Sequence, residues 1–383
     1  MKRTSRLALL LLVAALSAAC QLPGLGPQAT PTGSGQGAYL AALRAMGLAR
    51  YVDVEPAHDQ PVGRDDWVQY NYDPADGRCI DGSPFFVLAR PAGDSQHTLL
   101  WLSGGGACWP GQNACTTRAG LAQGLLFGLA YRNVIEATPG PGTPTPVPAN
   151  PLSDWNIISV PYCDGSVHLG DLAADYNEDG TADHYHQGLR MTSAAVALMK
   201  ELFPDSTKVL VAGCGAGGYG TILAAPIVRL QFPDAQLYVW NESGPGLYNP
   251  DRPDVRQTIL DTWNLDPHLP KAADCPDCRE QLLNVYGWLL DRDPDLYVGL
   301  YSSYQDAVVS DYLGMQPYAY QGLLLTTTDE LHARFPDQFR RFLVDGDSHC
   351  VDDYTQQVNG IAIRDWIAAM VNGDAAGWPD LRQ

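Results

Sequence analysis

The chain has 383 residues, of which 45% are hydrophobic, enough to bury one large core in a domain of ordinary size. Its 24 Lys and Arg residues against 43 Asp and Glu residues give a formal net charge of −19, which argues against nucleic acid or an anionic membrane surface as the partner. Nine cysteines are many for this length, and their meaning depends on the compartment.

The N-terminal segment has the pattern of a secretory signal peptide. Basic residues in the first six positions precede an apolar run at 7–16, and small residues lead into Cys20. The pattern resembles a bacterial lipoprotein signal, in which Cys20 becomes the lipidated first residue; ordinary cleavage with an unmodified cysteine is the alternative. No later run reaches the roughly 20 apolar residues of a membrane span. We therefore predict a signal peptide over 1–19 and a lipid anchor on the outer face of a bacterial membrane.

The remaining chain divides into a tether and a single folded domain. Residues 20–37 are rich in Pro, Gly, Ser and Thr, which predicts a flexible tether, so we expect the domain over 38–383. Apolar and aromatic runs predict strands at 67–72, 85–89, 98–102, 155–161, 209–212, 236–240, 296–301 and 340–345, the last strand. Helical spacing predicts helices at 39–48, 190–203, 219–230, 281–290, 306–313 and 361–371. Alternating strands and helices predict an α/β fold with a mostly parallel sheet.

One stretch, Lys208-Val-Leu-Val-Ala-Gly-Cys-Gly-Ala-Gly-Gly-Tyr-Gly, identifies the type of α/β fold. An apolar run, closely spaced glycines and an Ala- and Leu-rich continuation predict a strand, a sharp turn and a helix. This is the nucleophile elbow of an α/β-hydrolase, which projects one side chain above the carboxyl edge of a parallel sheet. Gly215 stands where the pattern G-x-S-x-G has its serine. The chain therefore has the sequence pattern of the elbow but lacks the serine hydroxyl that would be the nucleophile.

Two later residues have the positions of a catalytic acid and base. In α/β-hydrolases the acid and then the base follow the nucleophile, on loops after the last strands. Asp306 follows the expected strand at 296–301, and His349 follows the expected last strand. We predict that His349 is the general base and that Asp306 orients it. Glu242, at the end of the strand after the elbow, is the alternative acid.

A glycine-rich loop has the pattern of an oxyanion hole. Leu102-Ser-Gly-Gly-Gly-Ala-Cys-Trp follows an early strand, and glycines leave backbone N–H groups free to point at a developing negative charge. A tight turn without this role is the alternative. We predict that the N–H groups of Gly106, Ala107 and Ala216 form the oxyanion hole.

Taken together, these motifs resemble those of the pectin acetylesterase/Notum family over about residues 79–350. The motifs that carry the resemblance are Cys79-Ile-Asp-Gly-Ser-Pro, the glycine-rich loop, Val160-Pro-Tyr-Cys-Asp-Gly-Ser-Val-His, His186-Gln-Gly, the elbow, Asp306 and His349-Cys. The resemblance implies an α/β-hydrolase that cleaves an acyl ester of a sugar polymer or protein outside the cell, without a cofactor for catalysis. It also implies a serine nucleophile where this chain has Gly215.

Three interpretations of the elbow remain open. In the first, Cys214 is the nucleophile in a frame shifted by one residue. In the second, His349 activates water in place of the serine, and the oxyanion hole keeps a small part of the rate. In the third, the chain is a noncatalytic protein that binds glycans or acyl groups, or it carries an inactivating substitution.

The other cysteines fit disulfides in an oxidising compartment. If Cys20 is lipidated, eight remain, an even number. Cys108 and Cys115 are close enough to close the oxyanion loop. For Cys275-Pro-Asp-Cys we prefer a local disulfide to a zinc half-site or a redox pair. Of the four left over, Cys79, Cys163, Cys214 and Cys350, a pair formed by the last two would tie the elbow to the histidine loop.

An acidic loop has part of a calcium-binding pattern. Asp175, Asn177, Asp179 and Asp183 occupy positions 1, 3, 5 and 9 of an EF-hand-type loop with glycine at position 6, but position 12 is His186. A solvated acidic turn is the alternative. A calcium ion here would brace the loop structurally and take no part in catalysis.

The sequence thus predicts an α/β-hydrolase with a lid drawn from about 249–293. We expect a membrane-anchored carboxylic-ester hydrolase that removes acetyl or other acyl groups from polysaccharide, with activity reduced or lost because of Gly215. A cell-surface protein that binds glycans or acyl groups on the same scaffold is the alternative.

Overall fold

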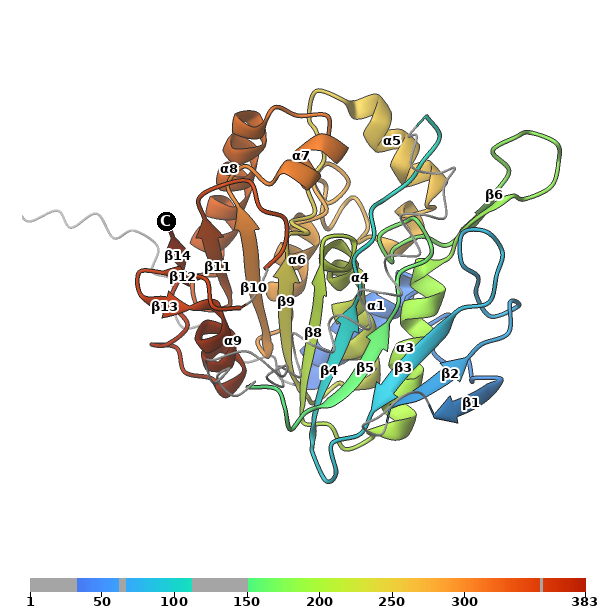
Figure 1. The fold of residues 1–383 in the computed structure, drawn as a ribbon, viewed down its shortest axis with the longest axis horizontal. Coiled ribbons are helices and arrows are strands. Elements are labelled where there is room, and N and C mark those ends of the chain that lie inside the picture. Colours follow the sequence, from blue (N-terminus) through green and yellow to red (C-terminus); the bar gives the residue numbers. More distant parts are fainter. Residues whose placement is uncertain (1–32, 62–66, 112–150, 352–353) are drawn as a thin grey trace, which may run out of the picture.

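The computed structural model describes residues 33–61, 67–111, 151–351 and 354–383, which form a ten-stranded sheet flanked by helices (Figure 1). The strand order is β1-β2-β3-β5-β4-β8-β9-β10-β11-β14. The strands are β1 His58–Pro61, β2 Val68–Asn71, β3 Phe86–Arg90, β4 His97–Leu102, β5 Asn156–Val160, β8 Lys208–Cys214, β9 Gln236–Glu242, β10 Leu296–Ser303, β11 Phe339–Val344 and β14 Leu381–Arg382. From β5 to β14 all neighbours are parallel, which confirms the predicted α/β-hydrolase fold.

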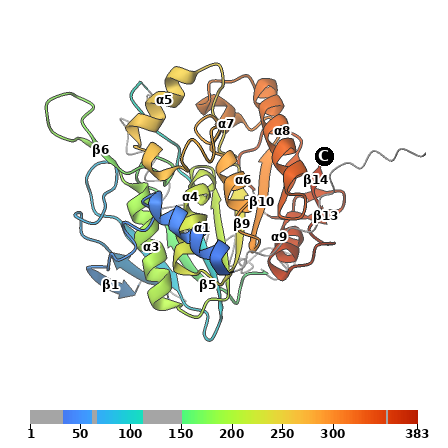
Figure 2. The same ribbon diagram turned by 180° about the vertical axis from the view of Figure 1, so that it is seen from behind.

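Helices cover the sheet and connect its strands. They are α1 Gly33–Ala45, α3 Gly188–Leu202, α4 Ala216–Gln231, α5 Pro253–Thr262, α6 Asn284–Leu290, α7 Ala307–Tyr312, α8 Pro317–Arg334 and α9 Ile363–Asn372. Figure 2 shows α1 and α3 in front of the strands on one side of the molecule. In the described part of the chain, no helix combines the length and the apolar character that a membrane span needs.

The strands alternate their side chains between two cores, as the two-residue period of a strand requires. On β8, Val209 and Val211 pack into the core that α1, α3, α4, α6 and α8 cover. Their neighbours Leu210 and Ala212 face the other core, which contains Trp366 of α9. The central strands are therefore buried on both faces, which explains their nearly continuous apolar sequence.

Two sequence predictions need correction, and two helices were missed. Helix α1 begins at Gly33, so residues 33–37 are helical and not part of a tether. The strand at 339–344 is not the last, because β14 pairs with it in parallel at the edge of the sheet. Helices α5 and α8 were not predicted at all. The buried face of α8 includes Thr327 and Thr328, whose hydroxyls bond to the carbonyls four residues earlier, so an apolar periodicity does not reveal it.

The segment between β9 and β10 lies over the sheet's carboxyl edge. It contains α5, a 3-10 turn (Asp266–His268), the Cys275–Cys278 disulfide and α6. In Figure 1, α5 and α7 lie together at the top of the molecule. Residues of α5 line the cavity described below, so the segment between β9 and β10 has the position expected for the lid at 249–293.

Candidate active site

The elbow lies between β8 and α4, and Gly215 is the residue at its tip. Gly215 has φ 57° and ψ −113°, a conformation that side-chain-bearing residues rarely adopt. Its N–H donates to the Glu242 carbonyl at 2.8 Å, and its carbonyl accepts from Tyr219 N–H at 3.0 Å. A Cβ at Gly217 would collide with the Leu102 carbonyl, so β4 and α4 approach closely only because residue 217 is glycine. The backbone of the predicted elbow is thus present.

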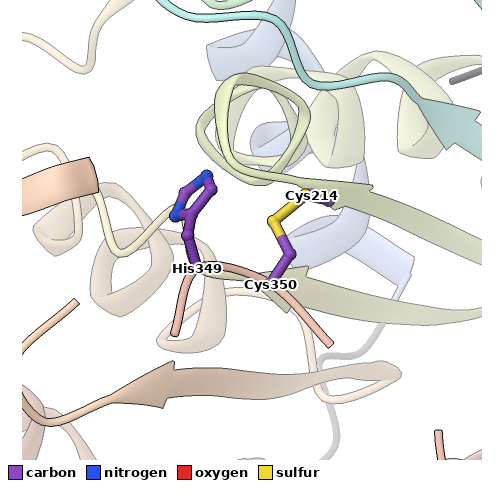
Figure 3. Close-up of side chains that lie close together, drawn as sticks. All are labelled: Cys214, His349 and Cys350. Carbon is purple, nitrogen blue, oxygen red and sulfur yellow. A yellow bond between two sulfur atoms is a disulfide. The ribbon is translucent and has the colours of Figure 1, made fainter. Parts of the chain in front are cut away.

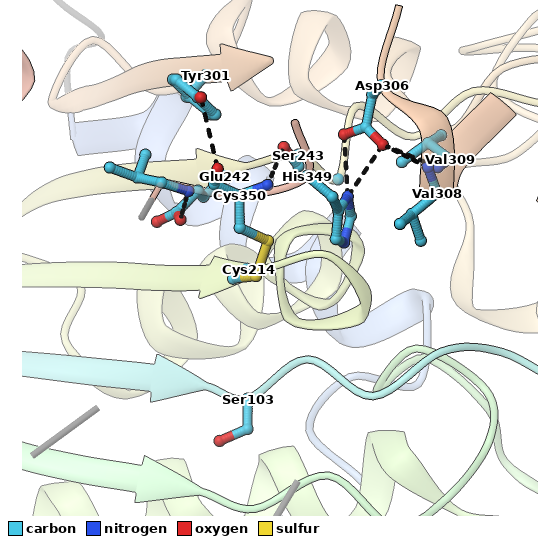
Figure 4. Close-up of a disulfide and its surroundings, with 12 residues drawn as sticks. Ser103, Cys214, Glu242, Ser243, Tyr301, Asp306, Val308, Val309, His349 and Cys350 are labelled. Atoms are coloured by element: carbon cyan, nitrogen blue, oxygen red, sulfur yellow. Dashed lines mark hydrogen bonds and ion pairs between the residues drawn. A yellow bond between two sulfur atoms is a disulfide. The ribbon is translucent and has the colours of Figure 1, made fainter. Parts of the chain in front are cut away.

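The predicted acid and base are in direct contact (Figure 4). Nδ1 of His349 donates to the carboxylate of Asp306, at 2.9 Å from Oδ2 and 3.1 Å from Oδ1. The Asp306 side chain is fully buried and caps α7, because Oδ1 also accepts from the N–H groups of Val308 and Val309. Three N–H donors therefore hold one carboxylate and fix which nitrogen of His349 carries its hydrogen.

Nε2 of His349 faces the tip of the elbow. An ideal Cβ built on Gly215 would lie 2.6 Å from Nε2, closer than unbonded atoms approach. The imidazole therefore occupies part of the space that a side chain at position 215 would fill. Gly215, the predicted base and the predicted acid therefore meet at one point, and glycine offers no side chain as a nucleophile there.

The predicted oxyanion donors surround the same point. Gly106, Ala107 and Ala216 line one cavity with Gly215 and His349. Among the described residues, no acceptor bonds to the backbone N–H groups of these three donors. Gly106 has φ 95°, and its carbonyl is held by the Tyr162 hydroxyl at 2.7 Å. The loop therefore presents free N–H groups, as an anion-binding site requires.

The cavity has a volume of about 460 Å³ and mostly apolar walls. Trp109, Trp263, Leu247 and Val309 are among the apolar residues that line it, and α5 contributes several polar ones. This size and lining are typical of a small-molecule or side-chain-sized binding site.

Glu242, the alternative acid, does not bond to His349, whose Nδ1 partner is Asp306. Its carboxylate accepts hydrogen bonds from Val351 N–H at 2.6 Å, the Tyr354 hydroxyl at 2.8 Å and Trp240 Nε1 at 3.2 Å. Burial raises the pKa of Glu242, against the lowering effect of these donors. The residue braces the segment that follows His349.

Cys214 is not available as a nucleophile, which corrects the shifted-frame interpretation. Its sulfur is bonded to that of Cys350, beside the imidazole of His349 (Figure 3). A sulfur in a disulfide has no thiolate to attack an ester. These three residues and the group Cys275, Asp277 and Cys278 have side chains close enough to bind a metal, but both groups contain a disulfide.

The other cysteine predictions have mixed outcomes. The local Cys275–Cys278 disulfide is confirmed, and Cys79 pairs with Cys163. Cys108 is in a disulfide, but its expected partner Cys115 lies outside the described residues. The signal peptide and Cys20 also lie outside them.

The acidic loop makes turn-like contacts within itself. Asp175 accepts from the N–H groups of Asp179 and Gly180, and Asn177 also accepts from Asp179 N–H. Asp183 bonds to His184 Nδ1 at 2.9 Å. The three aspartates are not among the described groups whose potential ligand atoms converge. Calcium binding here stays a prediction.

The sequence analysis missed the layer that supports the oxyanion loop. Cys108 N–H donates to the Gly165 carbonyl at 2.7 Å, and His168 Nε2 donates to the Ser103 carbonyl at 2.8 Å. His186 Nδ1 donates to the Asp164 carbonyl at 3.1 Å. The motif at 160–168 and the His186-Gln-Gly motif contain these residues, but a motif does not show which carbonyl each side chain will hold.

Comparison with known proteins gives a family match over the core of the site. The model of the Pectinacetylesterase family matches residues 68–264, which include the oxyanion loop and the elbow. Pectin acetylesterase 5 of Arabidopsis thaliana is 28% identical over 198 residues, 49% of this chain and 44% of the relative. The palmitoleoyl-protein carboxylesterase NOTUM of Mus musculus is 26% identical over 196 residues, 49% of this chain and 37% of the relative. The chain thus spans less than half the length of these relatives.

Proposed function

The chain belongs to the pectinacetylesterase family, a family of carboxylic-ester hydrolases, and we propose from this premise that its cavity binds an O-acyl ester of a polysaccharide and lacks the nucleophile for rapid cleavage. The observation that carries the proposal is that Gly215, His349 and three backbone N–H groups line one cavity. Asp306 bonds to His349 from behind, and none of the three N–H groups bonds to an acceptor in the part of the chain that the structure describes. Acyl transfer needs a base and an oxyanion site. The Asp306–His349 hydrogen bond supports the first, and the backbone N–H groups in the cavity wall support the second.

With serine at position 215 the reaction would follow the usual two steps. The serine oxygen would attack the acyl carbon while His349 Nε2 takes its proton, and the imidazolium would return that proton to the leaving alcohol. Water would then hydrolyse the acyl-enzyme in the same way. Asp306 would hold the imidazole in the right tautomer, and Gly106, Ala107 and Ala216 would donate to the carbonyl oxygen as it gains charge.

With Gly215, a water molecule must attack the ester directly. Its proton passes to His349 Nε2, the oxygen bonds to the acyl carbon, and the imidazolium gives the proton to the departing alkoxide. Loss of a triad serine costs on the order of 10⁶ in rate elsewhere, while binding and the oxyanion hole keep roughly 10³ to 10⁴ over water. We therefore expect slow hydrolysis and persistent binding of the ester.

We further propose that the protein works outside the cell, anchored by a lipid on Cys20, with one domain projecting from the anchor. The basic and apolar pattern of the first 19 residues supports this location. The disulfides support it as well, because such bonds persist in oxidising compartments.

Turnover of an aryl acetate by the chain with Gly215 and by Gly215→Ser tests the proposal. We expect a rate increase on the order of 10⁴ or more in the serine variant, because the base, the acid and the oxyanion donors are already in contact range. His349 must move outward to admit the new Cβ, and its side chain is 23% exposed, which leaves room for the shift.

Gly215→Ala is the matched control. It adds the same Cβ and the same backbone strain, about 1–3 kcal/mol for a sparsely populated positive-φ conformation, but no hydroxyl. We expect it to show no gain over the chain with Gly215. Equal rates for the serine and alanine variants would contradict the esterase proposal and favour the noncatalytic binding role.

A further inference from the structure

A tyrosine hydroxyl lies against the backbone of the oxyanion loop. Tyr312 is the last residue of α7 and lines the cavity together with Gly106. An ideal Cβ built on Gly106 would lie 2.5 Å from the hydroxyl oxygen of Tyr312 and 3.5 Å from the ring carbon that carries it. Any side chain at position 106 would therefore collide with this hydroxyl. Glycine leaves the space to Tyr312.

The hydroxyl is close enough to the Gly106 N–H for both to donate to one atom. A Cβ lies about 2.5 Å from its own amide nitrogen in standard backbone geometry, so the Tyr312 oxygen lies within about 5 Å of the Gly106 nitrogen. Two donors that each reach the same acceptor at about 3 Å are up to about 6 Å apart. One carbonyl oxygen in the cavity can therefore accept from the Gly106 N–H and from the Tyr312 hydroxyl together.

The Tyr312 hydroxyl is also free to donate. Within the described ranges of the chain, it has no hydrogen-bond partner. By contrast, the hydroxyl of Tyr162 donates to the Gly106 carbonyl at 2.7 Å. The hydroxyl of Tyr219, another residue of the cavity wall, donates to the Leu247 carbonyl at 3.1 Å. In a cavity with mostly apolar walls, a few placed polar groups orient the ligand, and the hydroxyl of Tyr312 is such a group.

Packing holds the ring of Tyr312 in place. Its centroid lies 6.5 Å from that of Trp109 in the oxyanion loop, and Trp109 packs edge-on against Trp263 at 6.2 Å. At the other end of α7, the N-cap Asp306 bonds to His349. One short helix thus carries both the carboxylate that orients the predicted base and a hydroxyl beside the oxyanion donors. A donor that is already in place needs no reorganisation during a reaction.

We propose that Tyr312 is a further catalytic residue, whose hydroxyl donates to the acyl carbonyl oxygen together with the N–H groups of Gly106, Ala107 and Ala216. The inference rests on the proposed function, because it takes the cavity as the ester-binding site. The phenol keeps its proton throughout. It stabilises the negative charge that develops on the carbonyl oxygen when water, or a serine at position 215, adds to the acyl carbon. The hydrogen bond weakens again when the alcohol leaves and the carbonyl re-forms.

Hydrolysis of an aryl acetate in the Gly215→Ser background tests this role. Tyr312→Phe removes the hydroxyl and keeps the ring that packs on Trp109. We expect kcat to fall by on the order of 10², with KM changed less than about threefold, because the hydrogen bond is strongest to the charged oxygen of the transition state. Tyr318→Phe is the matched control, since Tyr318 is 76% exposed on α8 and is not among the described residues that line the cavity. It should leave kcat and KM unchanged.

A transition-state analogue separates an oxyanion donor from a structural role. The carbonyl carbon of an aryl trifluoromethyl ketone bonds to the serine oxygen of Gly215→Ser, the serine proton passes to His349, and the ketone oxygen takes the negative charge. The matched methyl ketone adds far less readily and reports binding of the uncharged carbonyl. Tyr312→Phe should weaken binding of the trifluoromethyl ketone by about the factor that it removes from kcat/KM, and leave binding of the methyl ketone unchanged. A distorted cavity would weaken both.

An undiminished kcat in Tyr312→Phe would overturn the proposal, and this is the result that a purely space-filling role predicts, because phenylalanine preserves the ring. Equal losses of affinity for the two ketones would overturn it as well, and so would a loss of kcat in Tyr318→Phe as large as in Tyr312→Phe. The proposed function fails in a different way, through a Gly215→Ser variant that is no faster than Gly215→Ala, and Tyr312 then has no oxyanion to stabilise. An active serine variant that does not need the hydroxyl rejects only the role of Tyr312.

Discussion

The two sides of the candidate site are built in different ways. On the base side, His349 and Asp306 come from loops after β11 and β10, and side-chain hydrogen bonds hold both. On the elbow side, backbone geometry does the positioning: Gly215 has a positive φ, and the oxyanion donors are main-chain N–H groups. The base side depends on which side chains are present, whereas the elbow side depends on where the backbone runs.

This difference explains how the elbow keeps its shape without a nucleophile. A side chain at position 215 would be strained by about 1–3 kcal/mol in this positive-φ conformation, and glycine removes that strain. Replacing the nucleophile by glycine therefore costs the fold nothing. Replacing Asp306 would remove the cap of α7 together with the partner of His349. Loss of the nucleophile at position 215 therefore removes backbone strain, whereas loss of Asp306 would remove a helix cap.

Asp306→Asn in the Gly215→Ser background tests the base side with the largest expected effect. Asparagine still accepts from Val308 and Val309 N–H groups, so the cap of α7 persists. It cannot hold His349 in the required tautomer, and such a change lowers kcat by roughly 10³ to 10⁴. Steady-state hydrolysis of an aryl acetate measures the loss. A loss below tenfold would mean that Asp306 acts mainly as a helix cap.

The sequence was sufficient to predict much of this site. The elbow, Asp306 and His349 follow one another along the chain, and each comes directly after a predicted parallel strand. The carboxyl ends of parallel strands share one edge of a sheet, so the sequence predicts that the three lie close together at that edge. The Asp306–His349 hydrogen bond agrees with that expectation. Their roles in catalysis are part of the proposed function.

Other features depend on distances that a linear sequence does not contain. The pairing of Cys214 with Cys350 was one alternative among several, because four cysteines allow three connectivities. Helix α8 buries threonines that satisfy their hydroxyls locally, which hides its inner face.

The Cys214–Cys350 disulfide joins the two sides of the site covalently, and its removal should weaken their contact. A double variant, Cys214→Ser with Cys350→Ser, releases a bridge between residues 136 apart. In the chain-entropy model such long loops contribute more than short ones, and native bridges typically contribute about 2–4 kcal/mol. Urea unfolding measures this loss. The Cys275 and Cys278 bridge, with a separation of 3, is the internal control and should contribute less. Equal losses would show that the long bridge adds no special constraint between the elbow and His349.

Low pH should reduce the local stability of the elbow side before that of the base side, because the buried His186 supports the oxyanion loop. His186 donates to the Asp164 carbonyl, next to Gly165, whose own carbonyl holds Cys108 N–H. Its Nε2 accepts from the Tyr176 hydroxyl at 2.6 Å, an arrangement that needs the neutral ring. Burial lowers the pKa of His186 to about 4 from an ordinary value of 6.5.

The sign of the pH effect follows from this lowered pKa. The folded state binds fewer protons than the unfolded state between about pH 6.5 and pH 4, so stability is complete above that window and falls as the pH decreases through it, by on the order of 3 kcal/mol. His186→Gln should flatten this part of the dependence of unfolding free energy on pH.

Hydrogen exchange at pH 5 compares the two sides of the site. We expect faster exchange at Cys108 N–H than at Val309 N–H, which bonds to Asp306. Equal acceleration at both amides would mean that the two sides unfold as one unit, and the distinction between them would then concern chemistry alone.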